Sequence, residues 1–197
     1  MYPANKRESI TKTIPRVVIW ITIRMLLILA TLLGLQMRKI DYFQAFLQSE
    51  PSEDAYIQIP AGWEFIDKDD NAEYIIKLEN NIYRTVTGAR NWYHKSSAGL
   101  LTRDFKQSIY DPCLFMHDEL MIFVHTDACV CFSKKPETVE RIITDLKQDG
   151  FLLKDKGYAN ELLGDIIVYD MENKTIKMTK KGLIDSILYD MGLRSSK

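Results

Sequence analysis

An aspartate stands between two apolar runs in the stretch LMIFVHTDACVCFS, residues 120–133. Leu120–Val124 and Ala128–Phe132 have the length of strands, and the short polar segment between them predicts a β-hairpin. The tip of this hairpin would present His125, Thr126 and Asp127. For His125, a proton-shuttling role and an ordinary half-exposed hairpin position are both open from the sequence.

Asp41 is the second acidic residue whose position could serve chemistry, because it closes a predicted strand in RKIDYFQAFLQSE, residues 38–50. A fold that places Asp41 beside Asp127 sets two carboxylates on one sheet surface, where they repel each other unless a cation lies between them. Oxygen ligands suit Mg²⁺, and two such ions can hold both ends of an in-line displacement at phosphorus. A lone aspartate in a turn is common, so an ordinary solvated turn is the alternative.

These acidic residues need a sheet and covering helices to position them. Hydrophobic periodicity predicts helices over 15–35, 88–103, 135–151 and 181–193, and a short helical turn over 43–47. Strands are predicted over 55–60 and 73–78, in the hairpin, and twice within 161–179. This order predicts an α+β fold with an antiparallel sheet and helices packed on one face, nearest to the split β-α-β-β-α-β arrangement.

Composition narrows the class of protein. The 197 residues suit one domain, and the formal net charge of −1 supplies no global basic excess of the kind that nucleic-acid binders often carry. The acidic segment 64–73 lacks the full calcium-loop pattern and predicts a solvated turn. The odd set of cysteines argues against a disulfide scaffold and favours a reducing, intracellular compartment, cytoplasmic or nuclear; its members are Cys113, Cys129 and Cys131.

The apolar run VVIWITIRMLLILATLLGL, residues 17–35, allows two interpretations. Its length and the basic residues before it are typical of a membrane span or signal anchor. Arg24 near its centre opposes insertion by about 2.5–3.5 kcal/mol, whereas each Leu or Ile favours insertion by only about 0.3–0.6 kcal/mol. A helix buried in a globular core explains the run equally well on hydropathy alone.

Several stretches, in order, resemble the reverse transcriptase of copia-type retrotransposons. The segments that carry the likeness are TIRMLLILATLLGLQMRKIDYFQAFLQSE, AYIQIPAGWE, YIIKLENNIYRTVTGARNWY, SIYDPCLF, LLGDIIV and TIKMTKKGLIDSILYDMGL. Together they cover about residues 14–193, so a palm and partial-fingers domain is expected there, with disordered tails at 1–13 and 194–197. The resemblance implies that the apolar run is a palm helix in a protein core rather than a membrane anchor. It also implies that most of the fingers, the thumb and the ribonuclease H domain are lacking.

The resemblance assigns roles to residues at the two acidic positions. Counted without gaps, the family's Tyr-Val-Asp-Asp hairpin falls on His125, Thr126, Asp127 and Ala128, and its other carboxylate falls on Asp41. Asp41 and Asp127 would then be catalytic and hold Mg²⁺, and the Tyr42 carbonyl could add a ligand. The amides of Phe43, Gln44 and Ala45 would lie near an incoming deoxynucleoside triphosphate. Phe46 would be either the aromatic that blocks a ribose 2′-hydroxyl or a core aromatic.

Departures from the family pattern predict impaired chemistry. The second aspartate of the hairpin is Ala128, Thr87 replaces a glutamine, and Glu79 and Asn80 replace lysines. We therefore expect a truncated, degenerate reverse transcriptase domain whose ancestral reaction is Mg²⁺-dependent DNA synthesis on an RNA or DNA template-primer. Missing polyprotein domains could act in trans. The alternatives are a non-catalytic nucleic-acid or protein-binding remnant and a small protein anchored in a membrane through residues 17–35.

Overall fold

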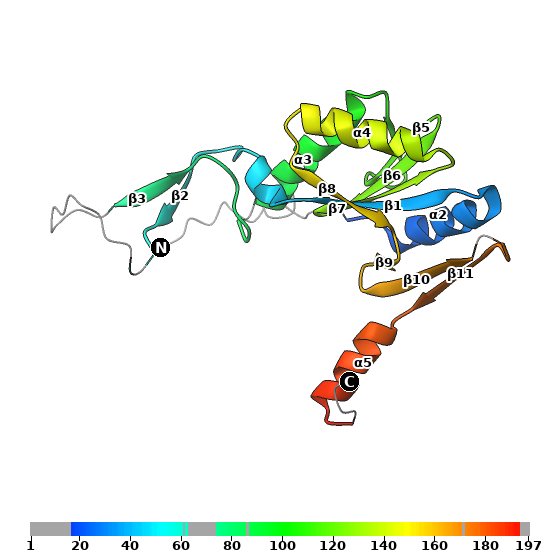
Figure 1. Ribbon diagram of the computed structural model, residues 1–197. Coiled ribbons are helices and arrows are strands. Elements are labelled where there is room, and N and C mark those ends of the chain that lie inside the picture. Colours follow the sequence, from blue (N-terminus) through cyan, green and yellow to red (C-terminus); the bar gives the residue numbers. More distant parts are fainter. Residues whose placement is uncertain (1–16, 61, 63–73, 86, 171, 194–197) are drawn as a thin grey trace.

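The computed structural model describes residues 17–60, 62, 74–85, 87–170 and 172–193 (Figure 1). The predicted tails at 1–13 and 194–197 and the acidic segment 64–73 lie outside this part of the chain. The elements are α2 (Trp20–Leu33), β1 (Gln36–Tyr42), η2 (Ala45–Gln48), β2 (Ala55–Gln58), β3 (Ile75–Leu78), α3 (Gly88–Leu101), β4 (Lys106–Gln107), β5 (Leu114–His117), β6 (Leu120–His125), β7 (Ala128–Ser133), α4 (Pro136–Gln148), β8 (Leu153–Tyr158), β9 (Glu161–Leu162), β10 (Asp165–Asp170), β11 (Thr175–Thr179) and α5 (Lys181–Asp190).

A six-stranded antiparallel sheet forms the centre of the molecule, in the order β4-β5-β6-β7-β1-β8. If the intervening η2 and β2 to β5 are set aside, the chain order is β1, α3, β6, β7, α4 and β8, and the four strands lie in the order β6-β7-β1-β8. This is the predicted split β-α-β-β-α-β arrangement. Strand β1 is an inner strand, so a residue near its end has a neighbouring strand on each side.

Both faces of this sheet are covered, which corrects the expectation that the helices pack on one face. Figure 1 shows α3 and α4 above the sheet and α2 below it, with the small sheet β11-β10-β9 beneath α2. Alternate strand residues serve the two cores: Ile122 and Cys131 pack toward α3 and α4, whereas Phe123 and Val130 pack toward α2. The hairpin strands are apolar on both faces, which is the pattern of strands that are covered on both sides. The sequence did not show which helix lies on which side.

Helix α2 begins at Trp20, five residues after the expected start at Pro15, which lies outside the described residues. Ile19 has an extended backbone, and its amide donates a hydrogen bond to Asp111 Oδ2 at 2.9 Å. This long-range bond holds the chain straight just before the helix. The helix ends at Leu33, two residues before the predicted end at Leu35, and is capped by Gly34, whose φ of 66° is the left-handed conformation that glycine adopts without strain.

The amphipathic helix predicted at 135–151 is confirmed as α4, with Pro136 in its first turn. Its buried stripe is Val139, Ile142, Ile143 and Leu146.

Strand β8 was not predicted from LKDKGY, because charged residues and a glycine interrupt the apolar alternation that identifies strands. This strand borders β1 and therefore matters for the site. Cys113, Cys129 and Cys131 are all buried.

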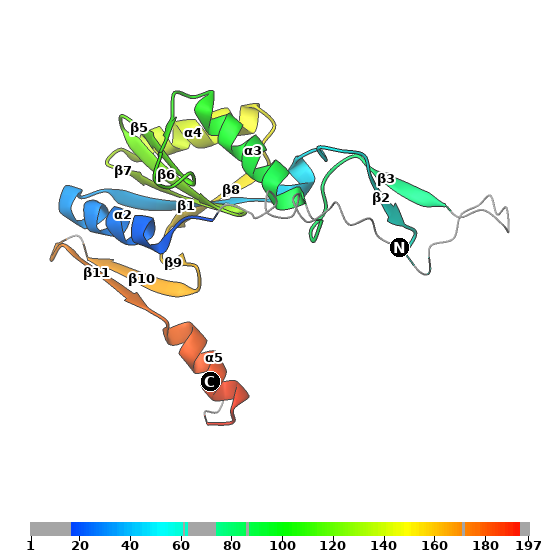
Figure 2. The same cartoon turned by 180° about the vertical axis from the view of Figure 1, so that it is seen from behind.

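Two parts extend from the body in both views (Figures 1 and 2): the hairpin β2-β3 and the helix α5. No described side chain of α5 is buried. Among the helices that the structure describes, none is long and apolar enough to cross a bilayer; α2 has 14 residues. The outer side of α2 nevertheless exposes apolar side chains: Ile21, Met25, Ile28 and Leu32.

Candidate active site

Main-chain hydrogen bonds bring Asp41 next to the hairpin tip. Asp41 is the second-to-last residue of β1, and its Cα is paired with that of Ala128 on β7 and with that of Lys154 on β8. The amide of the next residue, Tyr42, donates to the carbonyl oxygen of Asp127 at 2.7 Å. The residues next to Asp41 and Asp127 in the chain are thus directly bonded or paired, and a shared metal site for the two carboxylates stays a prediction.

The hairpin tip is a two-residue turn formed by Thr126 and Asp127, held from above by α3. Thr126 has a φ of 54°, a conformation that is uncommon for a β-branched residue. Its carbonyl oxygen accepts a hydrogen bond from Nε1 of the buried Trp92 at 2.6 Å. The indole therefore fixes the orientation of a strained turn, and with it the position of Asp127.

His125, which ends β6, lies across from Ala128. Its Nδ1 is buried, and the described part of the chain offers it no hydrogen-bond partner. Burial lowers the pKa of the imidazole, while the nearby Asp127 carboxylate acts in the opposite direction. The neutral ring is therefore the form that the fold favours. This geometry gives no evidence for the proton-shuttling interpretation.

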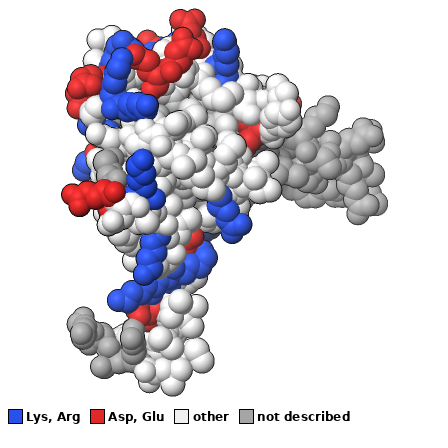
Figure 3. Space-filling model, turned by 90° about the vertical axis from the view of Figure 1, so that its right-hand side faces the viewer, with Lys and Arg blue, Asp and Glu red and all other residues white. Residues whose placement is uncertain are grey.

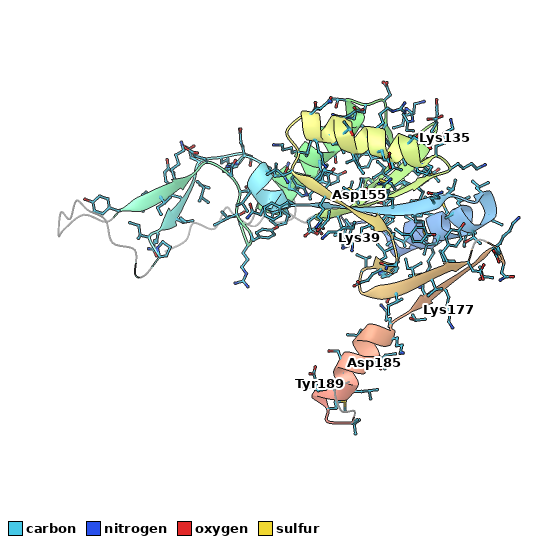
Figure 4. The ribbon with its side chains drawn as sticks, viewed as in Figure 1. Lys39, Lys135, Asp155, Lys177, Asp185 and Tyr189 are labelled. Carbon is cyan, nitrogen blue, oxygen red and sulfur yellow. The ribbon has the colours of Figure 1, made fainter. Side chains whose placement is uncertain are left out.

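The Asp41 carboxylate already has a cationic partner. Its Oδ2 lies 3.2 Å from Nζ of Lys156, and both side chains are partly exposed. Lys39 and Lys154 lie on the same face of the sheet as Asp41, because Lys39 is two residues before Asp41 and Lys154 is paired with it. Figure 4 shows Lys39 and Asp155 on opposite sides of β1 and β8. The surroundings of Asp41 are thus basic.

These residues do not fit the two-ion site that the family resemblance implies. The position across from Asp41 carries the methyl group of Ala128, where a third carboxylate was expected from the family pattern. Within the described ranges, no three His, Cys, Asp or Glu side chains lie close enough together to hold a metal ion. An aspartate paired with a lysine lacks the excess negative charge that concentrates a divalent cation.

The segment predicted to line a nucleotide site is tightly tied to the domain. Tyr42 is buried against Trp92 and hydrogen-bonds Cys129; burial raises the pKa of Tyr42 well above its usual range and that of the Cys129 thiol to about 12. The Phe43 amide donates to the Leu152 carbonyl at 2.9 Å, so it is used within the fold. The next two residues are Gln44, which has a φ of 49°, and the fully buried Ala45.

Phe46 is half-buried and contacts the core on the α3 side of the sheet. Its ring lies 4.6 Å from that of Tyr83, with 31° between the ring planes. The ring is therefore a packing residue in this structure. Selection of deoxynucleotides by the same ring stays a prediction.

Sequence reasoning missed Trp92 as a positioning residue, and it missed Lys156 and Tyr83. Trp92 was expected to face inward, but nothing in a single sequence shows which carbonyl a buried indole reaches. Lys156 could not be linked to Asp41 without the unpredicted strand β8. Tyr83 lies in a loop between elements, so no periodicity marked it.

The chain is similar to known proteins over nearly its whole length. A family model described as reverse transcriptase (RNA-dependent DNA polymerase) matches residues 3–197. The Retrovirus-related Pol polyprotein from transposon TNT 1-94 of Nicotiana tabacum is 24% identical over 181 residues, which cover 89% of this chain and 13% of the polyprotein. The corresponding polyprotein from transposon RE1 of Arabidopsis thaliana is 30% identical over 131 residues, covering 64% of this chain and 9% of the relative.

A yeast relative shows the same relationship. The Transposon Ty1-NL2 Gag-Pol polyprotein of Saccharomyces cerevisiae is 25% identical over 152 residues, which cover 76% of this chain and 8% of that polyprotein. The chain thus spans 8–13% of the length of these three relatives. No solved structure gives a significant match.

Proposed function

Because the chain belongs to the reverse transcriptase (RNA-dependent DNA polymerase) family, and its relatives are copia-type Pol polyproteins, we propose that it is a palm and partial-fingers domain whose polymerase chemistry has decayed. The ancestral reaction is the template-directed addition of deoxynucleotides to a primer 3′-hydroxyl, with Mg²⁺ as cofactor. Asp41 and Asp127 are the catalytic and metal-binding residues in that ancestral scheme. The segment Tyr42–Phe46 is its nucleotide-binding part.

The observation that carries the proposal is the register between β1 and β7. It pairs Asp41 with Ala128, so the hairpin delivers one carboxylate to the site. Phosphoryl transfer depends almost wholly on positioning and on neutralising charge. Removing a single electrostatic group from an active site typically lowers the rate by about 10²–10³-fold. The Lys156 ammonium at 3.2 Å from Asp41 weakens the negative potential of the site further.

Primer extension tests this proposal. The purified chain is incubated with a labelled template-primer and all four deoxynucleoside triphosphates, in Mg²⁺ and separately in Mn²⁺, beside an Asp127→Asn control. We expect the chain and the control to give the same background. Template-dependent extension that is present in the chain and lost in Asp127→Asn would overturn the decay proposal and show a working polymerase.

A second candidate is a non-catalytic module that binds nucleic acid or another part of a polyprotein, and the exposed apolar side chains favour its protein-binding form. Ile21 and Ile28 on α2, and Leu183 and Ile187 on α5, are more than 45% exposed. Figure 3 shows a largely uncharged area in the middle of one face of the molecule, with Lys, Arg, Asp and Glu gathered above and below it. Such surfaces are typical of protein interaction sites.

Two measurements separate the candidates. Fluorescence anisotropy with a labelled template-primer detects nucleic-acid binding, and size-exclusion chromatography with the remaining polyprotein domains as separate chains detects protein binding in trans. A module predicts at least one of these interactions together with background primer extension. A chain that shows neither interaction is no such module.

A further inference from the structure

The contact between Lys156 and Asp41 depends on an irregularity in β8. Along β1, Lys39 is paired with Gly157 and Ile40 with Asp155, so Lys156 is an extra residue that faces no partner on β1. A bulge of this kind bends the strand and re-aims a side chain. Here it directs the ammonium of Lys156 to within 3.2 Å of Asp41 Oδ2.

Neighbouring residues fix this bulge. Gly157 has a φ of 75°, which glycine adopts readily, and its amide donates to Asp155 Oδ1 at 2.8 Å. The other oxygen of that carboxylate accepts a bond from Arg38 on β1. Asp155 and Arg38 thus fix the bulge on the face of the sheet that α4 covers, where Arg38 also pairs with Glu140. Lys156 pairs with Asp41 on the opposite face.

We infer that Lys156 is the built-in cation of Asp41 and that it keeps divalent metal ions off this carboxylate. The inference rests on the proposed function, because it explains at the same site why a polymerase-like pair of aspartates lacks the charge for a metal. A single carboxylate that is paired with an ammonium group is neutral as a unit. A divalent ion must displace Lys156 and then remain near it, against charge repulsion.

Other charges near Asp41 act in the same direction. Lys154, paired with Asp41, and Lys39, two residues before it, present two more ammonium groups on this face. Ala128, on the other neighbouring strand, supplies no compensating carboxylate. Asp127, at the hairpin tip, is then the acidic side chain that a metal ion could still bind. Three lysines, Lys39, Lys154 and Lys156, stand against the two aspartates of the site.

Metal binding by the folded chain, with no nucleic acid present, tests the inference. Electron paramagnetic resonance measures free Mn²⁺ in a titration of the full chain, and Asp41→Asn defines the binding by all other surface groups. We expect the unmodified chain to match Asp41→Asn. Lys156→Met should bind Mn²⁺ at least about tenfold more tightly than the unmodified chain, since a cation is removed from the immediate surroundings of the site.

Lys154→Met is the matched control, because it removes the same charge from the same strand while leaving the Lys156–Asp41 pair in place. It should bind Mn²⁺ nearly as weakly as the unmodified chain. Lys156→Gln provides a second, more polar replacement, and circular dichroism confirms that every variant is folded. If neither Lys156 variant exceeds the unmodified chain, or if Lys154→Met gains as much, Lys156 is not the excluding cation.

The result is separable from that of primer extension. Ala128→Asp combined with Lys156→Met restores a carboxylate and removes the competing ammonium, so this double variant should bind Mn²⁺ more tightly than either single variant. An active unmodified chain in primer extension would overturn the decayed-polymerase proposal. An unchanged Mn²⁺ affinity in Lys156→Met and Lys156→Gln would overturn the role of Lys156 whatever the primer-extension result.

Discussion

At the scale of single residues, the site is organised by main-chain bonds and by one indole. The Tyr42 amide reaches the Asp127 carbonyl, and Trp92 reaches the Thr126 carbonyl, so two successive carbonyl groups of the hairpin tip are each fixed from outside the hairpin. The side chains that would do chemistry contribute little to this arrangement. The position of the hairpin tip thus depends on main-chain groups and the Trp92 indole, whereas any reaction would depend on the carboxylates. Substitutions can therefore test the two separately.

Replacing Trp92 by Phe tests the anchoring of the tip. Phe keeps an aromatic ring but is smaller than the indole and has no N–H, so the buried Thr126 carbonyl loses its donor and space is left in the core. The unmade buried hydrogen bond alone costs about 1–3 kcal/mol, and equilibrium urea denaturation should show a loss of at least this size in the free energy of unfolding. Trp20→Phe is the control, since Trp20 is 39% exposed and should cost much less. Equal losses in both variants would contradict a special role for the Trp92 bond.

The lowered pKa of His125 predicts that the free energy of unfolding depends on pH. Burial is the main cause of the lowered pKa of His125 in the folded chain. As the pH falls, the unfolded chain therefore binds a proton at this residue at a higher pH than the folded chain does. Its contribution to stability is complete above the unfolded pKa of about 6.5 and is lost as the pH falls through the lower folded value. His125→Asn should therefore show a smaller decrease in the free energy of unfolding between pH 7 and 5. Parallel pH profiles for the two proteins would exclude this effect.

At the scale of elements, the sequence predicted those helices and strands that have a regular apolar spacing. It did not predict those that depend on pairing with a distant segment. The stripe of α4 and the two apolar runs of the β6-β7 hairpin follow directly from residue spacing. The start of α2 depends on Asp111, which is 92 residues away from Ile19. Strand β8 and its bulge depend on pairing with β1, so neither β8 nor the partner of Asp41 could be predicted locally.

The crossing of α3 over Phe151 gives a test of packing between elements. A Cβ atom at Gly99 would lie 2.7 Å from the Phe151 ring, and Phe151 is buried. Gly99→Ala should thus be destabilising by about 1–3 kcal/mol through overpacking, reduced by up to about 1 kcal/mol of gained helix propensity. In Gly182→Ala, which has open space around the new Cβ on α5, only the favourable propensity remains. Thermal unfolding of both variants measures the difference, and a stabilised Gly99→Ala would refute the close contact.

At the scale of the whole molecule, the two cores lie on the two faces of one sheet, and α5 contributes no buried side chain to either. The link before α5 is nevertheless fixed, because Lys180 pairs with the buried carboxylate of Asp165 at 2.6 Å. Cooperative stability should therefore be a property of the part ending at Lys180. The fold class could be predicted from the sequence, and the continuous apolar runs of β6 and β7 indicate strands covered on both faces. Which helix covers each face depends on contacts between distant segments and could not be predicted.

A chain that ends at Lys180 tests this division. Its unfolding temperature should lie within about 2 °C of that of the full chain, since little packing is lost. By contrast, Leu162→Ala removes a buried side chain next to α2 and should lower the unfolding temperature by several degrees, in line with a cost of about 2–5 kcal/mol. Differential scanning calorimetry measures both. A truncated chain that unfolds far earlier would show that α5 is integral to the domain.

The pairing of Asp41 with Ala128 leaves the side chain at position 128 open to change during evolution. The strand ladder at that position is made by peptide groups, so exchanging the side chain at 128 leaves every rung in place. The backbone pairing therefore does not require an acid at position 128, and a carboxylate there would add repulsion across from Asp41. Mutation at position 128 can therefore exchange an acid for a methyl group while the pairing of β1 with β7 persists.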